Sequence, residues 1–213
     1  MKKTNKKGFT LIELLVVIAI IAILSVVVIL TLNPAELLKQ ARDSNRVSDL
    51  STLKSAISLY LSDVSSPNIA QSSTVATNFG CTSGGTCYNY CYESTIAGNG
   101  TTTSRCGVFN NMSGTSNVSS SASTYQRNVD GNGWVPVNFT SISSGAPVGN
   151  LPVDPVNNVS YYYAYAASST LTFEIDAFME SAKYTTGANG VIANDGGNNS
   201  STYEVGTASN LAL

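Results

Sequence analysis

The chain contains no histidine, and only 11% of its 213 residues are charged. Without histidine, serine and cysteine triads in their usual form and most zinc sites are excluded. No paired-carboxylate or nucleophile motif stands out along the sequence. These absences favour a structural or binding protein over an enzyme.

One long apolar run is present near the N-terminus. Residues 14–32 include only Ser25 and Thr31 as polar residues. At about 1.5 Å per residue, such a helix approaches the length that spans a bilayer. Four lysines precede the run and the next one is Lys39. This charge bias favours a cytoplasmic N-terminus and a translocated C-terminal part.

The alternative to a retained membrane helix is a cleaved secretory signal. The apolar core of such a signal is about 7–15 residues long and is followed by a small-residue cleavage site. Here the run is longer, and residues 33–42, NPAELLKQAR, continue it as a helix. We therefore expect the apolar helix to stay in the mature protein.

The residues that follow the run predict a second helical half. Asn33-Pro34-Ala35-Glu36 is typical of an N-cap with a first-turn proline, but it also fits a kink at Pro34 inside one long helix, which we favour. Apolar residues then recur at three- and four-residue steps to about residue 63. This stripe is Val47, Leu50, Leu53, Ile57, Tyr60 and Leu61. We expect the charged residues nearby to be solvated or in contacts between subunits: Arg42, Asp43, Arg46, Asp49 and Lys54.

Strand signals gather in the C-terminal half. Residues 133–139, 159–167 and 170–181 are rich in β-branched and aromatic residues and are separated by turn-rich segments. In the last of them, Leu171, Phe173 and Ile175 alternate with Thr172, Glu174 and Asp176. We predict an α+β fold in which the second helical half packs on a small antiparallel sheet. The tyrosines at 161, 162, 163 and 165 are expected to be half core and half surface.

The N-terminal residues carry a specific motif. Residues 6–14, KKGFTLIEL, combine a basic leader, Gly8, Phe9 and a carboxylate, Glu13, at the fifth position after the glycine. This segment resembles the cleavage and methylation motif of the type IV pilin and pseudopilin superfamily. Residues 151–163, LPVDPVNNVSYYY, are similar to the loop and strand of major pseudopilins.

The resemblance implies a domain plan. Residues 1–8 would be a leader that a membrane prepilin peptidase removes after Gly8, and the same machinery would methylate the new amine of Phe9. Residues 9–32 would form the transmembrane and filament-core helix, and 33–64 its second half. Residues 65–213 would form an extracytoplasmic head, with a cysteine-bearing insert at 68–128, a sheet at 133–180 and a C-terminal loop region at 185–213.

The resemblance also implies location and partners. The chain would span the cytoplasmic membrane once before assembly and lie in an extracellular pilus or on the cell surface afterwards. Its partners would be further copies of itself, other pilins, the peptidase and methylase, and an assembly platform. Loss of the leader leaves seven basic against thirteen acidic residues. That balance argues against a nucleic-acid-binding surface.

Glu13 is a carboxylate in a segment otherwise suited to lipid. A charge at the centre of a membrane helix costs about 2.5–3.5 kcal/mol unless it finds a partner. Cleavage would remove Lys6 and Lys7 and leave the amine of Phe9, four residues away, as the nearest cation. We expect Glu13 to neutralise its own or a neighbouring terminus and so to act in assembly. The alternative is that Glu13 caps its own helix, for about 0.3–1 kcal/mol.

All four cysteines, Cys81, Cys87, Cys91 and Cys106, lie in the part expected to be translocated. An even number in an exported chain favours two disulfides, and three pairings are open. We favour Cys81–Cys87 with Cys91–Cys106, because short loops close readily. A Cys₄ zinc site is disfavoured because the spacings lack paired two-residue knuckles.

The C-terminal loop offers oxygen ligands. Asp195, Asn198, Asn199 and Glu204 cluster around two glycines, a composition that suits calcium. The resemblance supports this, since major pseudopilins hold calcium in a C-terminal loop. An ordinary turn-rich surface loop without a cofactor is the favoured alternative.

The expected function is that of a non-enzymatic pilin that builds a filament. A pseudopilin of a type II secretion or DNA-uptake machine is the alternative within the superfamily. In a different class, the chain would be a single-pass membrane-anchored extracellular binding module. A plain anchor has no use for Glu13 at that depth.

Overall fold

The computed structural model describes residues 8–69, 90–94, 117–120, 126–168, 170–185 and 190–207. The chain divides into two compact units, Met1–Lys39 and Gln40–Leu213. Cys81, Cys87 and Cys106 lie outside the described residues, and Cys91 is described for its backbone alone. The disulfide pairing therefore stays a prediction.

Two helices follow each other at the N-terminus. Helix α1 spans Leu11–Leu32 and helix α2 spans Pro34–Asp63. Between them Asn33 adopts the left-handed conformation, with φ of 40°. The Asn33 carbonyl accepts the first hydrogen bonds of α2, from the backbone N–H groups of Glu36 at 3.0 Å and Leu37 at 3.3 Å. Pro34 is thus the first residue of α2, where its missing N–H leaves no partner unsatisfied.

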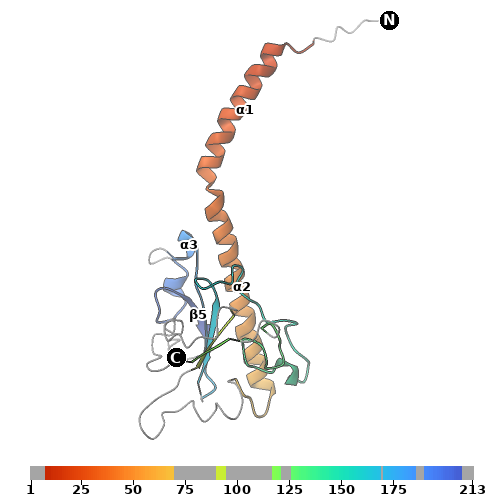
Figure 1. The fold of residues 1–213 in the computed structure, drawn as a ribbon, viewed down its shortest axis with the longest axis vertical. Helices are drawn as coiled ribbons and strands as arrows, with labels where there is room; N and C mark the ends of the chain where they lie inside the picture. Colours follow the sequence, from red (N-terminus) through yellow and green to blue (C-terminus); the bar gives the residue numbers. More distant parts are fainter. Residues whose placement is uncertain are drawn as a thin grey trace, which may run out of the picture. The chain divides into compact units, whose positions relative to one another are not determined.

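The second unit contains a five-stranded sheet in the order β2-β1-β3-β4-β5. Its edge strand β5 is labelled in Figure 1. Strands β1 (Tyr90–Glu93), β3 (Tyr163–Ala167), β4 (Phe173–Ala177) and β5 (Tyr203–Gly206) pair in antiparallel fashion. Strand β2 (Asn117–Ser120) pairs with β1 in parallel. The short helices η2 (Phe139–Ser141), α3 (Ala182–Thr185) and η3 (Ile192–Asn194) lie between or after strands. The predicted α+β class is confirmed, with one parallel strand added at an edge.

The core lies between α2 and one face of the sheet. The buried residues of α2 that join it are Leu50, Leu53, Ala56, Ile57 and Tyr60. The sheet contributes Tyr163, Tyr165, Phe173, Ile175 and Val205. The predicted apolar stripe is therefore the packing face of α2, with Val47 and Leu61 half-buried at its margin. Truncating one of its leucines to alanine would cost about 2–5 kcal/mol.

Residues 133–139 do not form the predicted strand. Trp134, Val135, Val137 and Phe139 are all buried, but the segment makes an isolated bridge between Asp130 and Asn138 and then enters η2. Pro136 has no N–H to donate to a ladder, which disfavours a central strand here. The apolar composition of residues 133–139 therefore indicates a buried segment and not a β-strand.

Two other expectations about side-chain placement are wrong. Leu171 does not share the core face with Phe173 and Ile175: it lies in the β3–β4 turn, with φ of 63° and an exposed fraction of 38%. Among the four tyrosines, Tyr163 and Tyr165 face the core, Tyr162 is buried as well, and only Tyr161 is half-buried, so half of them do not lie on the surface.

Candidate functional site

The N-terminus of α1 is closed by its own side chains. Thr10 is the N-cap, and its hydroxyl accepts a hydrogen bond from the Glu13 backbone N–H at 3.3 Å. In return, Glu13 Oε2 accepts from the Thr10 N–H at 2.8 Å and from the Thr10 hydroxyl at 2.6 Å. This reciprocal capping box satisfies backbone donors that the first turn leaves open.

The residues just before the helix are open. Phe9 has an exposed fraction of 81%, and Gly8 is exposed, with no atom within 4 Å of the place where a Cβ would stand. A peptide bond at such a position is accessible to a protease. The expected cleavage point between Gly8 and Phe9 thus lies on unobstructed backbone.

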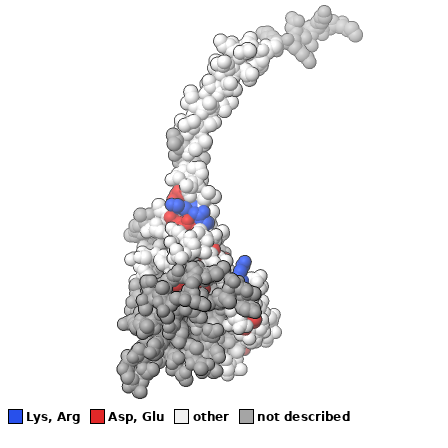
Figure 2. All heavy atoms as spheres, viewed as in Figure 1, with Lys and Arg blue, Asp and Glu red and all other residues white. Residues whose placement is uncertain are grey.

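Helix α1 presents an apolar surface on all sides. Its segment Leu11–Ile29 has a mean hydropathy of 3.3, and none of it is buried within the chain. The Ser25 hydroxyl donates to the Ile21 carbonyl at 2.7 Å, so this polar group is satisfied inside the helix. Over the face that Figure 2 shows, α1 is free of charged side chains. A surface of this kind needs lipid or other apolar helices around it.

A family model for the prokaryotic N-terminal methylation motif matches residues 3–29. The chain carries the signature of type IV pilins and pseudopilins. No curated protein and no solved structure matches the chain significantly. The signature implies processing by a prepilin peptidase and assembly with other pilins, and together with α1 it fits a membrane-anchored structural subunit.

Within this pilin signature, the observed partner of Glu13 is Thr10. The contact matches the capping alternative, in which the carboxylate stabilises the N-terminus of its own helix. In the uncleaved sequence Phe9 follows Gly8 in peptide linkage and has no free amine. The assembly role of Glu13 concerns the cleaved chain and stays a prediction.

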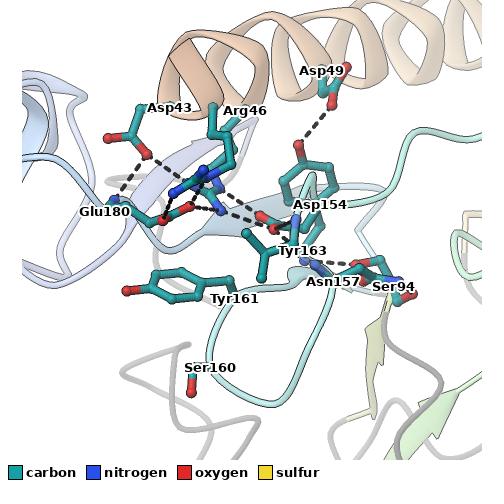
Figure 3. Close-up of polar contacts among 12 residues, drawn as sticks. Asp43, Arg46, Asp49, Ser94, Asp154, Asn157, Ser160, Tyr161, Tyr163 and Glu180 are labelled. Carbon is teal, nitrogen blue, oxygen red and sulfur yellow. Dashed lines mark hydrogen bonds and ion pairs between the residues drawn. The ribbon is translucent and has the colours of Figure 1, made fainter. Parts of the chain in front are cut away.

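The head contains a second polar cluster, which sequence reasoning missed. Arg46 on α2 is fully buried, and its guanidinium binds Asp154 in bidentate fashion, with Nε–Oδ2 of 2.6 Å and Nη2–Oδ1 of 3.0 Å (Figure 3). Arg46 also contacts Asp43 at 2.7 Å and Glu180 at 2.6 Å. The Tyr161 ring covers the guanidinium, with its centroid 5.2 Å from Cζ.

The carboxylates around Arg46 are themselves held by backbone donors. Asp43 accepts hydrogen bonds from the N–H groups of Glu180 and Ser181, at 2.9 and 2.8 Å, and from the Ser181 hydroxyl at 2.6 Å. Asp154 accepts from the N–H groups at 156 and 157. With these contacts the cluster joins α2 to the loop before β3 and to the segment after β4. Satisfied lone pairs are what makes a buried ion cluster tolerable.

The expectation that Asp43 and Arg46 are solvated is therefore wrong. Their partners come from far along the chain, 108 residues from Arg46 for Asp154 and 138 from Asp43 for Ser181, so no local pattern announces them. The one local signal is Asp154 in the LPVDP segment, whose resemblance to major pseudopilins predicts a loop and a strand but no contact with α2. Arg42 lies at the rim and binds Glu180 with two hydrogen bonds.

Burial and the neighbouring charges have opposite effects on the pKa of Arg46 in this cluster. Burial alone would lower the pKa of Arg46, but the hydrogen bonds and charges of its carboxylate partners raise that pKa above its usual value. The hydrogen bond from Arg42 lowers the pKa of Glu180. Both groups are therefore charged at neutral pH.

Nearby, the Tyr163 hydroxyl donates to Asp49 Oδ2 at 2.7 Å (Figure 3). Burial raises the pKa of Tyr163 and also that of Asp49, although the hydrogen bond from Tyr163 acts on Asp49 in the opposite direction. This contact fixes another point of α2 to β3.

The C-terminal loop brings two of the four predicted calcium ligands together. Asp195 Oδ1 accepts from the Gly197 N–H and Oδ2 from the Glu204 N–H, each at 2.9 Å. Glu204 Oε2 accepts from the Asn199 N–H at 2.8 Å. The Asn199 side-chain oxygen accepts from the Ser201 N–H at 2.9 Å. These side-chain oxygens accept hydrogen bonds from the loop's own backbone, and a Glu204 oxygen also lies within 4.8 Å of carboxylate oxygens of Glu174 and Asp176 on β4.

Proposed function

We propose that the chain is a pilin, the structural subunit of a type IV pilus-like filament. After cleavage behind Gly8 and methylation of Phe9, α1 helices of many copies pack together in the filament core, and the heads lie outside. Before assembly, α1 holds the chain in the cytoplasmic membrane with the head on the outer side. In this proposal the chain is not an enzyme.

The exposed apolar surface of α1 carries the proposal. A single anchor also needs a helix of this length, but in such an anchor Glu13 would serve only as a cap of its own helix. In a filament core, the same helix would bury its surface against its neighbours, and each Glu13 would meet an N-terminal amine. Packing of the apolar helices and pairing of Glu13 with an N-terminal amine would then both stabilise the filament core.

A pseudopilin of a secretion or DNA-uptake machine would share the motif, the helix and the processing. The difference lies in the length and abundance of the filament. Mechanical shear releases long pili from cells, whereas pseudopilins and single-pass anchored modules stay with the membrane.

The test is to shear cells that express the chain and to examine the released material by electron microscopy and mass spectrometry. A pilin gives filaments whose main band starts with N-methylated Phe9. Chain that is processed but stays in the membrane fraction at normal expression supports the pseudopilin alternative. Chain that keeps residues 1–8 contradicts both.

A further inference from the structure

The two faces of the sheet differ in chemistry. Paired residues in neighbouring antiparallel strands point to the same face, and successive residues alternate. Tyr165 pairs with Ile175, and Ile175 with Val205, on the face that packs on α2. On the opposite face, Asp176 pairs with Glu204 of β5, and Glu174 is two residues along β4. That second face is acidic.

The acidic face is nevertheless buried. Glu174, Asp176 and Glu204 have exposed fractions of 0%, 1% and 0%. Sequence alternation alone would place Glu174 and Asp176 toward solvent, since an antiparallel sheet commonly has one wet face. Carboxylates taken out of water need a compensating charge or hydrogen bonds.

The three carboxyl groups converge on one point. One oxygen of each, from Glu174, Asp176 and Glu204, lies within 4.8 Å of the other two. Such a spacing fits oxygens that share a single cation, and it is unfavourable for three like charges without one.

Two of the three carboxyl groups carry oxygens that meet no hydrogen-bond donor among the described residues. Within the described part of the chain, neither carboxylate oxygen of Asp176 accepts a hydrogen bond, and neither does Oε1 of Glu204. Glu204 is held in place through its other oxygen, which accepts from Asn199. The Gly197 backbone lies against the same carboxylate, so that a Cβ there would come to 1.9 Å from Oε2. The acidic point is thus lined by buried oxygens of Asp176 and Glu204 that accept no hydrogen bond within the described residues.

Protonation is the competing way to relieve the repulsion. Burial raises the pKa of Asp176 well above its usual value, and the charges of Glu174 and Glu204 raise it further. Burial also raises the pKa of Glu204. If protonation alone relieves the repulsion, adding a cation should not stabilise the protein. Cation binding and protonation can therefore be told apart by experiment.

We propose that Glu174, Asp176 and Glu204 bind one calcium ion on the face of the sheet that is turned away from α2. The ligands are hard oxygen donors, and three carboxylates supply up to six of the six to eight oxygens that calcium takes. Magnesium demands a smaller, regular octahedron and keeps its water, so it fits a buried set of flexible carboxylates less well. The site differs from the C-terminal loop proposed from the sequence and shares only Glu204 with it. It does not depend on filament formation.

The test is calcium titration of the full-length chain, purified in detergent and stripped of metal with EDTA. Calorimetry should give one site, and a calcium concentration near 100 times Kd should raise Tm by about 5–10 °C. Magnesium should bind at least about tenfold more weakly. Absence of both heat and a Tm shift with calcium would overturn the proposal, and so would equal binding of the two ions.

Two variants locate the ion. Asp176→Asn should bind calcium at least about tenfold more weakly, and because it removes a buried charge it should melt no lower than wild type in EDTA, which shows that it folds. Asn198→Ala, in the loop, should bind like wild type. Calcium binding that survives Asp176→Asn but is lost in Asn198→Ala would assign the ion to the loop and overturn the proposal. The exposed Asp130, whose carboxylate accepts from the Asn132 N–H, offers a neutral control as Asp130→Asn.

Discussion

Arg46 and Asp154 form a bidentate, fully buried ion pair across 108 residues of sequence, and this pair fastens α2 to the loop that leads into β3. Replacement of Arg46 by alanine would leave three carboxylates around an empty place in the interior. Loss of one partner of a buried pair costs about 3–5 kcal/mol. Urea denaturation of Arg46→Ala should show a loss of this size.

The matched control is Arg42→Ala. Arg42 also binds Glu180, but its side chain is 34% exposed, and Glu180 keeps Arg46 as a partner. Because exposed pairs contribute about 0–1 kcal/mol, this variant should lose at most that amount. If Arg42→Ala and Arg46→Ala lower the free energy of unfolding equally, the buried contacts of Arg46 do not stabilise the fold more than the exposed pair of Arg42.

Glu180 makes stability depend on pH in acid. Its pKa is lowered in the folded chain by the hydrogen bond from Arg42, so its contribution is full above the unfolded value near 4.5 and is lost as pH falls through the lower folded value. Glu180→Gln should cost about 1–3 kcal/mol at pH 7 and progressively less below pH 4.5. The buried acids with raised pKa are present in both wild type and Glu180→Gln. Their effect on stability therefore cancels when the free energies of unfolding of the two proteins are subtracted. A cost that stays constant from pH 7 to pH 2 would contradict this prediction.

Glu13 has two roles that one pair of variants can separate. Glu13→Gln keeps an oxygen that can accept from Thr10 but loses the charge, whereas Thr10→Ala loses the cap and keeps the charge. If the charge drives assembly, Glu13→Gln and Glu13→Ala cells should contain processed subunit but few or no filaments. Thr10→Ala, which costs the helix about 0.5–2 kcal/mol, should still give filaments.

Immunoblots of membrane and sheared fractions, together with electron microscopy, measure both outcomes. Normal filaments from Glu13→Gln cells at unchanged subunit levels would refute the assembly role. The capping box would then be the function of Glu13.

Leu171 holds a backbone conformation that suits glycine. For a residue with a side chain, the left-handed region costs about 1–2 kcal/mol, and Leu171 recovers little of this by burial. Leu171→Gly should leave the free energy of unfolding unchanged or raise it by up to about 1 kcal/mol, since glycine also loses more entropy on folding. Leu171→Val should lower it. Thermal denaturation that ranks valine above glycine would contradict this prediction.

The four cysteines should contain no free thiol in the exported chain. Cys81, Cys87, Cys91 and Cys106 are even in number and lie in the part expected to be translocated. Alkylation of the native chain without reductant should leave its mass unchanged, and reduction before alkylation should add four groups. A native chain that takes up four groups at once would rule out both disulfides.

Local patterns predicted what depends on neighbouring residues. The three- and four-residue spacing of Leu50, Leu53 and Ile57 gave the packing face of α2, and the alternation of Phe173 with Glu174 gave the two faces of β4. The N-terminal motif pointed to the family because its residues act close together in sequence. Such signals need no knowledge of the rest of the fold.

What failed depended on distant partners. Arg46 is buried because Asp154 and Glu180 receive it, and Glu174 and Asp176 are buried although their face of β4 reads as polar. Trp134 lies in a segment that is apolar like a strand, yet its indole N–H bonds to the Pro152 carbonyl at 2.8 Å outside any ladder. For Arg46 and Trp134 a tertiary contact overrode the local preference.

The ion cluster also has a mechanical consequence. Asp43 and Arg46 lie within the first two turns of the part of α2 that belongs to the head, ahead of the apolar contacts that begin at Leu50. A pull on the N-terminal side of α2 would therefore load these charged contacts first, and the leucine face could peel away only after they had broken. Buried ion pairs and hydrogen bonds break after small displacements. Under tension the head would therefore stay intact up to a threshold force and then unfold abruptly, instead of stretching gradually.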